Sequence, residues 1–369
     1  ESGPLQLHVH QALSGKQLTS VDANGSDSLA DLRQRVFAKL GCSDENMELV
    51  MGTQSLHGAT TISQSGLTNG SIIEAVRCSP QYVVTTSVDR TAKIWSAGSG
   101  VCIRTLNGHQ RPVKCAVFSP DGKLIASCSE DTTIKLWSVD TGDCLCTLQP
   151  RDSSAHRDTV YAVAFAPDGD SLATASADRT AKLWNFEKGE CKLTFLGHKG
   201  AVYSVDFSPD GRSVVTSSYD RTACIWCCEK GNCLKVLDKH VRPVRTASFS
   251  PDGSHIVTGS NDHIARLFPV SSGKCMSQLV GHRGTVHSAS FSHDGSTVLT
   301  CSEDATAKLW SATTGVMMLT LHGHSALVHS AAFSPDSVFV ITASFDGTAS
   351  IWNAADGQRL LSLCGHCSA

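Results

Sequence analysis

The sequence lacks the features expected of membrane, nucleic-acid-binding and cofactor-dependent proteins. No apolar run approaches the ~20 residues of a membrane-spanning helix, and no secretory signal is visible at the start. The net charge of −3 over 369 residues gives no electrostatic case for binding nucleic acid or an anionic membrane. A glycine-rich phosphate loop before a helix and a helical pair of metal-binding histidines are also missing. We therefore expect no catalytic residues, no cofactor and no metal.

Aromatic residues are scarce, at 6% of the chain, yet the six tryptophans recur at one phase of a repeat. Each lies six residues after an aspartate, and the pairs follow one another at spacings of 42, 47, 42, 42, 42 and 42 residues. The aspartates are Asp89, Asp131, Asp178, Asp220, Asp262, Asp304 and Asp346. The aromatic residues are Trp95, Trp137, Trp184, Trp226, Phe268, Trp310 and Trp352. A period of about 40–45 residues with this signature indicates a β-propeller.

Each repeat divides into four short β-strands. In the repeat that begins at His282, β-rich runs at 286–291, 298–302, 307–310 and 316–321 are separated by polar turns. Seven such antiparallel blades close a ring without leaving long bare edges. The sequence therefore predicts a mainly β chain with a seven-bladed propeller over residues 79–369. Residues 149–154 lengthen one connection between blades and are predicted to form an exposed loop.

The repeat resembles the WD-repeat β-propellers over residues 79–366. The resemblance rests on Gly-His pairs such as Gly323-His324, on Ser-x-Asp-x-Thr turns and on strands that end in Lys-Leu-Trp or Ile-Trp. Departures are local. Ala155 and Lys239 replace the glycine of two Gly-His pairs, and Phe268 replaces one tryptophan.

The resemblance implies a buried hydrogen-bond network in each blade, which joins aspartate, histidine, a hydroxyl group and the indole N–H. These residues also look like a Ser-His-Asp catalytic set. The structural interpretation is favoured because the group repeats in blade after blade, whereas an active site normally occurs once. The network histidines are His109, His156, His198, His240, His282, His324 and His366. Circular continuation would place His366 against the first blade, with Asp89 and Trp95.

Two positions vary in character from blade to blade and are candidates for binding other proteins or peptides. One is the residue before the turn aspartate, and the other follows the first valine of the first strand. In propellers resembling this one, these positions meet peptide partners, and aromatic residues and arginine are common interface anchors. The candidates are Lys114, Glu130, Tyr161, Tyr203, Tyr219, Arg245, His287, Glu303, His329 and Phe345. The alternative is a solvated rim with no single ligand.

Residues 1–78 do not fit the repeat. The pattern predicts strands at 5–10 and 17–21, a helix after Ser28, and strands at 47–51 and 71–76. This order resembles ubiquitin and implies a small α+β (β-grasp) domain. The Gly-Gly tail of ubiquitin is missing, so conjugation to substrates is not expected. Leu13, Val50 and Val76 fall at positions that match the apolar patch of ubiquitin, and are either covered sheet residues or a docking patch.

Residues 73–78 fit two structures at once. Their pattern, Ile73-x-x-Val76-x-Cys78, also matches the first strand of a blade, as in Val113-x-x-Ala116-x-Phe118. Second, third and fourth strands occur seven times, but unambiguous first strands occur only six times. We expect the ubiquitin-like sheet to take residues 73–78, which leaves the first blade with three strands. The alternative gives them to that blade.

Sixteen cysteines are present, but their placement does not favour disulfides. Cys102, Cys144, Cys191, Cys233 and Cys275 share one repeat phase, on the fourth strands of five different blades. Such positions are too far apart to bridge. Cys224, Cys227 and Cys228 are interpreted as strand residues, not metal ligands. Free thiols predict a reducing compartment, either the cytoplasm or, as alternatives, the nucleus or the cilium.

These features predict a non-enzymatic scaffold or adaptor in a multiprotein complex. Three alternatives stay open from the sequence: a ciliary or dynein-assembly WD-repeat factor, a substrate receptor of a ubiquitin ligase, and the regulatory part of an enzyme. Glu1 is not a methionine, which leaves room for an upstream segment that carries the catalytic part. Nucleic acid and membranes are not expected partners.

Overall fold

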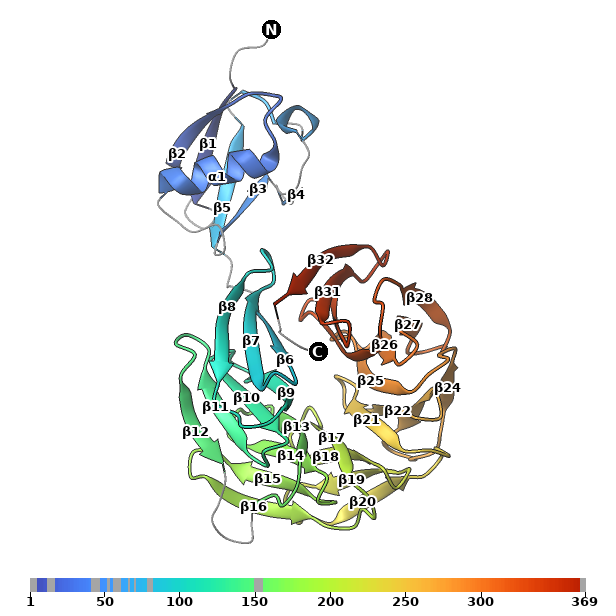
Figure 1. Ribbon diagram of the computed structural model, residues 1–369. Coiled ribbons are helices and arrows are strands. Elements are labelled where there is room, and N and C mark those ends of the chain that lie inside the picture. The colour runs from blue at the N-terminus through green and yellow to red at the C-terminus, as the bar shows by residue number, and fades with distance from the viewer. Residues whose placement is uncertain are drawn as a thin grey trace. The chain divides into compact units, whose positions relative to one another are not determined.

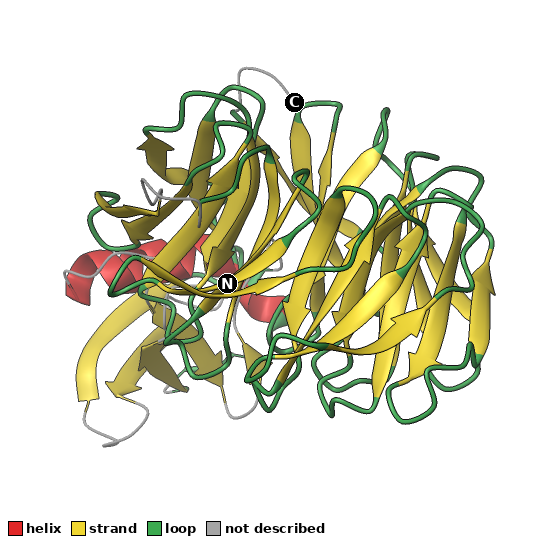
Figure 2. Ribbon diagram, turned by 90° about the horizontal axis from the view of Figure 1, so that it is seen from below, coloured by secondary structure: helices red, strands yellow, loops and turns green. Residues whose placement is uncertain are grey.

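The computed structural model describes residues 5–11, 17–40, 47–51, 54–55, 61–65, 67–69, 71–77, 82–148 and 155–365. The chain divides into two compact units (Figure 1). The first comprises Glu1–Tyr82 with Ser96–Ser99, and the second comprises Val83–Trp95 with Gly100–Ala369. Both units consist mainly of strands, and the described residues contain one α-helix, α1 (Figure 2).

The first unit is a five-stranded mixed sheet packed on one helix. Its elements are β1 (Leu5–Gln11), β2 (Gln17–Ala23), α1 (Leu29–Leu40), β3 (Met47–Met51), β4 (Gln54–Ser55), a short 3₁₀ helix (Ile62–Gln64) and β5 (Ile72–Arg77). The strand order is β2-β1-β5-β3-β4, with β1 and β5 parallel. Ser28 and Asp31 cap α1 reciprocally, because each side chain accepts the other's backbone N–H. Alternate strand residues such as Leu7 and Val9 face Leu32 and Val36 in a closed core.

β5 pairs on both sides within this sheet. It runs parallel to β1 and antiparallel to β3. Ile73 is fully buried in the core shared with the helix. Residues 72–77 therefore belong to the sheet of the first unit and not to the first blade, the other structure that their pattern fits. Of the predicted apolar patch, Leu13 lies outside the described residues, and so do the side chains of Val50 and Val76.

The second unit consists of seven antiparallel sheets in its described residues, numbered here as blades 1 to 7. Blade 1 contains β6 (Tyr82–Thr86), β7 (Thr91–Ser96) and β8 (Cys102–Asn107). Blade 2 contains β9 (Val113–Phe118), β10 (Leu124–Ser129), β11 (Ile134–Ser138) and β12 (Cys144–Leu148). Blade 3 contains β13 (Val160–Phe165), β14 (Leu172–Ser176), β15 (Ala181–Asn185) and β16 (Glu190–Phe195). Blade 4 contains β17 (Val202–Phe207), β18 (Ser213–Ser218), β19 (Ala223–Cys227) and β20 (Cys233–Leu237).

The last three blades continue the same plan. Blade 5 contains β21 (Val244–Phe249), β22 (His255–Ser260), β23 (Ile264–Pro269) and β24 (Ser277–Val280). Blade 6 contains β25 (Val286–Phe291), β26 (Thr297–Ser302), β27 (Ala307–Ser311) and β28 (Met317–Leu321). Blade 7 contains β29 (Val328–Phe333), β30 (Phe339–Ser344), β31 (Thr348–Asn353) and β32 (Arg359–Cys364). The predicted division of each repeat into four strands is thus confirmed for blades 2 to 7.

Neighbouring blades pack through their first two strands. Ala126 and Cys128 of β10 share one apolar cluster with Val160 and Val163 of β13, the inner strand of the next blade. The same arrangement recurs between later blades, so each second strand is covered by the following inner strand. Figure 1 shows the blades of this unit following one another in chain order around a common centre. Each 42-residue repeat builds one blade. Because the apolar faces of a blade are buried against its neighbours, a single blade would not be stable alone.

Blades 1 and 7 also share a core. Trp95 of β7 packs with Ala349 and Leu363 of blade 7, and the main chain at Gly365 passes directly over its indole. A Cβ atom at Gly365 would lie 3.1 Å from Cη2 of Trp95. His366 and the loop at 149–154, both singled out from the sequence, lie outside the described residues.

The thirteen cysteines within the described residues are free. Cys102, Cys144 and Cys233 begin outer strands, and Cys191 lies one residue inside β16. The prediction for Cys275 was wrong, because β24 starts only at Ser277. The backbone N–H of the intervening Met276 bonds to the carbonyl of Leu267, so the chain approaches β23 before the regular strand begins.

Candidate partner-binding face

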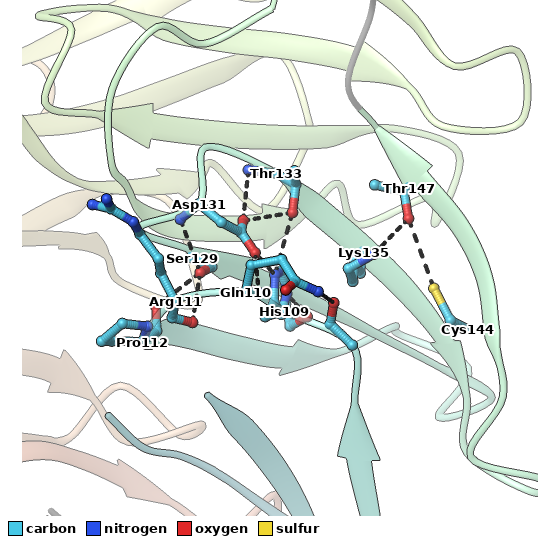
Figure 3. A network of polar contacts seen from close by, with 12 residues as sticks. His109, Gln110, Arg111, Pro112, Ser129, Asp131, Thr133, Lys135, Cys144 and Thr147 are labelled. Atoms are coloured by element: carbon cyan, nitrogen blue, oxygen red, sulfur yellow. Dashed lines mark hydrogen bonds and ion pairs between the residues drawn. The ribbon is translucent and has the colours of Figure 1, made fainter. Parts of the chain in front are cut away.

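Each blade is held by a polar network, shown for blade 2 in Figure 3. The carboxylate of Asp131 accepts four hydrogen bonds. His109 Nδ1 (2.9 Å) and the N–H of Gln110 (2.8 Å) donate to Oδ2, and the N–H (3.0 Å) and hydroxyl (2.6 Å) of Thr133 donate to Oδ1. All lone pairs of the carboxylate are thereby used. The network fastens the loop before β9 to the turn between β10 and β11.

The histidine extends the hydrogen-bond network into the interior of the blade. His109 Nε2 lies 2.8 Å from the hydroxyl oxygen of Ser127, and the indole N–H of Trp137 donates to that same oxygen at 2.8 Å. Because Nδ1–H donates to aspartate, Nε2 must accept the hydroxyl proton. The serine oxygen is then free to accept from tryptophan, so every buried polar atom of the chain of bonds is satisfied.

The same geometry recurs in the other complete blades. The His Nδ1 to Asp Oδ2 distances are 2.7 or 2.8 Å for His156–Asp178, His198–Asp220, His240–Asp262, His282–Asp304 and His324–Asp346. The indole donors Trp184, Trp226, Trp310 and Trp352 each lie 2.8 Å from a threonine hydroxyl. In blade 1, Trp95 Nε1 donates to Thr85 at 2.7 Å, and Thr91 donates to Asp89. These hydrogen bonds are the geometric basis for interpreting the histidines and aspartates as structural residues.

Blade 5 departs from the other complete blades in its aromatic residue and in the donors to its aspartate. Phe268 replaces tryptophan, and Arg266 on the same strand places Nη1 2.8 Å from Oδ2 of Asp262. Both side chains of this ion pair are nearly buried. A turn threonine is also absent, since Ile264 follows His263 where Thr306 follows Ala305 in blade 6. The arginine thus supplies the carboxylate with a donor that the turn no longer provides.

The network moves the pKa values of its histidines and aspartates away from neutral pH. Burial lowers the pKa of His109, His156 and His240 more than their aspartates raise it, so these imidazoles are neutral at pH 7. Burial alone raises the pKa of Asp178, but hydrogen bonds from His156, Thr180 and the N–H of Arg157 outweigh it and hold the pKa below its usual range. The hydroxyls of Ser127 and Thr174 are fully buried. A hydroxyl that is buried and used in two hydrogen bonds suits a structural role.

The predicted partner-binding residues of the first strands lie on β-bulges. In blade 3, Val160 pairs with Ser176 and Ala162 with Ala175, which leaves Tyr161 as the extra residue. The same register shift leaves Lys114, Tyr203, Arg245, His287 and His329 as the extra residues of their strands. A bulge re-aims a side chain away from the regular alternation of the sheet. The six predicted positions therefore share one local geometry, which the sequence pattern did not reveal.

The bulge residue meets the residue 16 positions later, which precedes the turn aspartate of the same blade. Lys114 Nζ lies 2.7 Å from Oε1 of Glu130. The rings of Tyr203 and Tyr219 lie 6.5 Å apart, and those of His329 and Phe345 lie 5.9 Å apart. A backbone hydrogen bond brings the two segments together in each case, as between the N–H of Tyr219 and the carbonyl of Ala201. We call these bulge residues and their partners the bulge face.

Three consecutive blades of the bulge face are joined by aromatic contacts. Tyr161 of blade 3 packs on Tyr203 of blade 4, with ring centroids 5.2 Å apart. The guanidinium of Arg245 in blade 5 lies 4.4 Å from the centroid of the Tyr203 ring, in a cation–π arrangement. Burial raises the pKa of both Tyr161 and Tyr203, so their hydroxyls stay protonated. Tyr219 is 57% exposed and available for contact.

Asn261 belongs to the face but is absent from the predicted set. Its Oδ1 accepts a hydrogen bond of 2.8 Å from Nε of Arg245. The bond orients the guanidinium over the tyrosine. Asn261 precedes the turn aspartate Asp262, so it occupies one of the two positions singled out from the sequence although it is not among the ten candidates.

Histidines form the other half of the face. The imidazoles of His287 and His329 stack with centroids 5.4 Å apart and an interplanar angle of 27°. Burial, followed by the charge of Arg245, lowers the pKa of His287. Enclosure by the surrounding blades, followed by the charges of His287, Lys114 and Arg245, lowers the pKa of His329 to about 4, although the residue keeps contact with solvent. Phe345 next to it is 50% exposed.

Glu303 completes the set on an exposed turn. Its Oε2 accepts a hydrogen bond of 3.4 Å from the N–H of Thr285, and hydrogen bonds from Thr285 hold its pKa below the usual value. Glu130 at the other end of the face borders a cavity of about 580 Å³ that lies between the loops of blades 2 and 3. The cavity is lined by polar residues that include Arg111, Lys135 and Arg157.

The described residues hold no cluster of three or more side chains of the metal-binding type. Within the same described residues, no helix has both the length and the apolar character needed to cross a membrane.

Comparison with protein families gives six matches to the WD domain, G-beta repeat (WD40). They fall at residues 100–138, 142–185, 189–227, 231–268, 273–311 and 315–353, and together cover more than half of the chain. Each match runs from the outer strand of one blade to the third strand of the next. The first unit and strands β6 and β7 lie outside the matched residues.

Local similarity to curated proteins is confined to short segments. The chain is 47% identical over 47 residues to nuclear distribution protein PAC1 of Mycosarcoma maydis, which is 13% of this chain and 10% of that protein. It is 54% identical over 37 residues to the F-box-like/WD repeat-containing protein TBL1X of Mus musculus, covering 10% of this chain and 7% of that one. It is 31% identical over 77 residues to the probable E3 ubiquitin ligase complex SCF subunit sconB of Aspergillus niger, covering 18% and 12%. The chain thus spans about a tenth of the length of the curated relatives it matches.

Proposed function

Because this chain belongs to the WD40-repeat family, whose repeats support protein–protein interaction, we propose that it is a non-enzymatic scaffold that binds a partner protein on the bulge face. The observation that carries this proposal is the continuous contact from Tyr161 through Tyr203 to Arg245, which spans three blades. Aromatic and arginine side chains held rigidly in place are the usual anchors of protein interfaces.

The charges of the face favour a partner that is recognised mainly by shape and apolar contact. Lys114 is paired with Glu130 at 2.7 Å. The lowered pKa values of His287 and His329 make both imidazoles neutral at pH 7. Arg245 and Glu303 are left as opposite charges on different blades. We therefore expect binding to weaken little when the salt concentration rises, since paired charges give little net attraction to a partner.

The exposed rings provide anchoring points for such a partner. Tyr219 and Phe345 are about half exposed, and they stand beside the partly buried Tyr203 and the imidazole of His329 respectively. An extended or helical peptide with apolar side chains could cover both rings, because each presents an apolar surface backed by a second ring. Burying an aromatic side chain of this kind contributes about 1.5–3 kcal/mol.

The proposal is tested with the full chain carrying Tyr203→Ala and Tyr219→Ala together. The matched control is Leu360→Ala, which removes an exposed apolar side chain from the outer strand of blade 7. Proteins that co-purify with the wild type are quantified by mass spectrometry against each variant, with circular dichroism to verify folding. We expect the tyrosine variant to lose its partners and the control to keep them. Equal recovery of partners by both variants would refute the proposal.

A second candidate is a substrate receptor of a ubiquitin ligase. One relative bears the name of a probable subunit of an SCF ubiquitin ligase complex, and the sequence of the first unit resembles ubiquitin. The co-purification experiment separates the two, because a receptor would bring down ligase subunits. If ligase subunits are consistently absent while other partners depend on Tyr203 and Tyr219, the general scaffold function is favoured. The free cysteines of the described residues support a reducing compartment, and we propose the cytoplasm as the location of the protein.

A further inference from the structure

Two cysteines stand directly opposite each other in blade 2. Cys115 lies on the inner strand β9 and Cys128 lies on β10, and the two residues are paired in the antiparallel register. Residues that stand opposite each other in such a ladder point to the same face of the sheet. The Cα atoms of such a pair lie about 4.5–5.5 Å apart, which falls within the range of about 4.4–6.8 Å found for disulfide-bonded cysteines. The backbone of blade 2 therefore meets the main geometric requirement for a bridge.

The equivalent position of another blade shows that side chains of this pair can touch. In blade 4 the position is occupied by Ser204 and Ser217, whose hydroxyl oxygens lie 2.7 Å apart across the ladder. In both blades the pair directly follows the bulge of the inner strand. The other complete blades pair Ala162 with Ala175, Thr246 with Gly259, Ser288 with Cys301, and Ser330 with Ala343. Among the six complete blades, all described at this position, only blade 2 has a thiol on both strands.

The cysteine pair lies where blade 2 packs against blade 3. Cys128 is fully buried in the apolar cluster that contains Val160 and Val163 of β13, and Cys115 packs against the same cluster. Sγ of Cys115 lies 4.0 Å from the carbonyl oxygen of Val163. Cys115 is half-buried, so a small oxidant can approach the pair from this residue. Both thiols are free in this structure.

The two thiols differ in acidity. A hydrogen bond from the thiol of Cys128 lowers the pKa of Cys115 and outweighs the opposite effect of burial. Burial raises the pKa of Cys128 well above its usual value. Because the thiolate is the nucleophilic form of cysteine, Cys115 is suited to attack an oxidant and Cys128 is suited to respond as a protonated neighbour. A thiol of low pKa beside a second thiol is the arrangement of a redox-sensitive cysteine and its resolving partner.

We propose that Cys115 and Cys128 form a reversible oxidation site, at which hydrogen peroxide converts the two free thiols into a disulfide between β9 and β10. The thiolate sulfur of Cys115 attacks one peroxide oxygen, so that an S–O bond forms and the O–O bond breaks. The departing hydroxide takes up the proton that Cys115 released and becomes water. The sulfur of Cys128 then attacks the sulfur of the sulfenic acid, so that an S–S bond forms and the S–O bond breaks. The second hydroxide leaves as water with the proton of Cys128.

The reaction balances without any further reactant. The two thiols lose two electrons together, and one molecule of hydrogen peroxide is reduced to two molecules of water. The reverse step needs a dithiol, which reduces the bridge by thiol–disulfide exchange and is itself oxidised to a disulfide. A reducing compartment therefore keeps the pair in the free form seen here, and exposure to peroxide closes the bridge.

The oxidation site lies near one end of the bulge face but does not depend on it. Cys115 directly follows Lys114, whose ammonium group pairs with Glu130 of the same blade. The oxidation is a reaction of two sulfur atoms inside blade 2 and needs no partner protein. The proposed function rests on tyrosines and an arginine of blades 3 to 5, so failure of either proposal leaves the other measurable.

The sequence allows the bridge to be detected directly, because trypsin separates the two cysteines. Cleavage after Lys114, Lys123 and Lys135 gives the peptides 115–123 and 124–135, each of which contains one cysteine. The full chain is treated with hydrogen peroxide at neutral pH, unreacted thiols are alkylated in denaturant, and the digest is analysed by mass spectrometry without reduction. We expect the two peptides to be joined, and to separate after treatment with dithiothreitol. At low peroxide concentration Cys115 should be oxidised at least about tenfold more than the exposed Cys102.

Two variants assign the roles of the cysteines with residues that other blades already carry at this position. Cys128→Ala places there the alanine found in blades 3 and 7, and Cys115→Ser places the serine found in blades 4, 6 and 7. In Cys128→Ala, peroxide should stop at a sulfenic acid on Cys115, which a cyclic dione such as dimedone traps. In Cys115→Ser, the thiol of Cys128 should stay reduced.

Circular dichroism recorded during the peroxide treatment shows whether the protein stays folded. The proposal is overturned if the two peptides stay separate at peroxide concentrations that oxidise Cys102, or if the bridge appears only after the folded signal is lost. It is also overturned if Cys128 forms bridges with other cysteines as readily as with Cys115. Oxidation of Cys128 in Cys115→Ser at the rate of the wild type would likewise refute the assigned order of reaction.

Discussion

The imidazole Nδ1 of His156 lies 2.7 Å from Oδ2 of Asp178, and both groups are enclosed between a loop and a turn of blade 3. The pair is the outermost link in the path from Asp178 through His156 and Thr174 to the indole of Trp184. Removing Asp178 would leave Nδ1 of His156 and the hydroxyl of Thr180 to find new partners.

Asp178→Ala should therefore destabilise the second unit by ~2–4 kcal/mol, because it leaves a buried histidine without its partner. Asp238→Ala is the control, since Asp238 is exposed and its ion pair is with the neighbouring, exposed Lys239. We expect the control to change the free energy of unfolding by less than about 0.5 kcal/mol. Urea unfolding followed by tryptophan fluorescence measures both. Similar values for the two variants would contradict the structural role of the network.

Blade 5 allows a test of how the network depends on local space. In five blades a glycine lies against the indole, as Gly281 lies against Trp310, and a Cβ atom there would come within 3.0–3.2 Å of the ring. Blade 5 has Lys239 at the corresponding position and the smaller Phe268 as the aromatic residue. We expect Phe268→Trp alone to destabilise the protein and Lys239→Gly with Phe268→Trp to recover the loss. A double-mutant cycle should give a coupling free energy of ~0.5–3 kcal/mol. Strict additivity of the two changes would rule out this steric account.

Backbone strain in the turns after the aspartates gives a third prediction. Ala305 adopts a φ of 64°, whereas blade 7 has Gly347 at the same position with a φ of 83°. Nothing lies within 4 Å of a Cβ atom built on Gly347, so a substitution there affects only the backbone conformation. Gly347→Ala should destabilise by ~1 kcal/mol, and Ala305→Gly should stabilise by ~0.5–1 kcal/mol. Thermal unfolding by calorimetry gives both values, and changes of the same sign at the two sites would contradict the prediction.

The stacked histidines of the bulge face predict a pH dependence. Burial, with the nearby positive groups, lowers the pKa of His329 to about 4, and the pKa of His287 is lowered too. Between the ordinary value of 6.5 and about 4, the unfolded chain takes up protons that the folded chain does not. The second unit should therefore lose stability as the pH falls through this range. NMR titration of the imidazole C–H signals checks the assignment, and a midpoint for His329 above 6 would refute it.

The contribution of His329 to partner binding should stay nearly constant between pH 7.5 and 5.5, because a pKa of about 4 keeps its imidazole neutral over that range. The measurement is partner affinity at several pH values. His329→Phe is the matched variant, since it keeps an aromatic ring and removes the titrating group. Affinity that falls steeply in the wild type but not in this variant would show that a charged imidazole forms at higher pH.

The sequence by itself determined the repeat, its strands and the members of the network. The interval of 42 residues between Asp–Trp pairs and the alternation within each run are local properties, and they are dictated by short-range geometry. The runs at 286–291 and 307–310 correspond to β25 and β27 for this reason. Of the partners of Asp131, His109 was expected from the resemblance to WD-repeat propellers, whereas Gln110 and Thr133 were found only in the structure.

Only the tertiary structure decided between alternative interactions that the local sequence pattern fits equally well. The pattern of residues 73–78 fits two sheets, and the pairing of β5 with both β1 and β3 settles it, because two neighbours and a buried Ile73 outweigh one edge. The bulge that turns Tyr161 toward Tyr203 is likewise invisible in a pattern of period two. Contacts of this kind depend on which surfaces meet when the blades pack, and no single stretch of sequence carries that information.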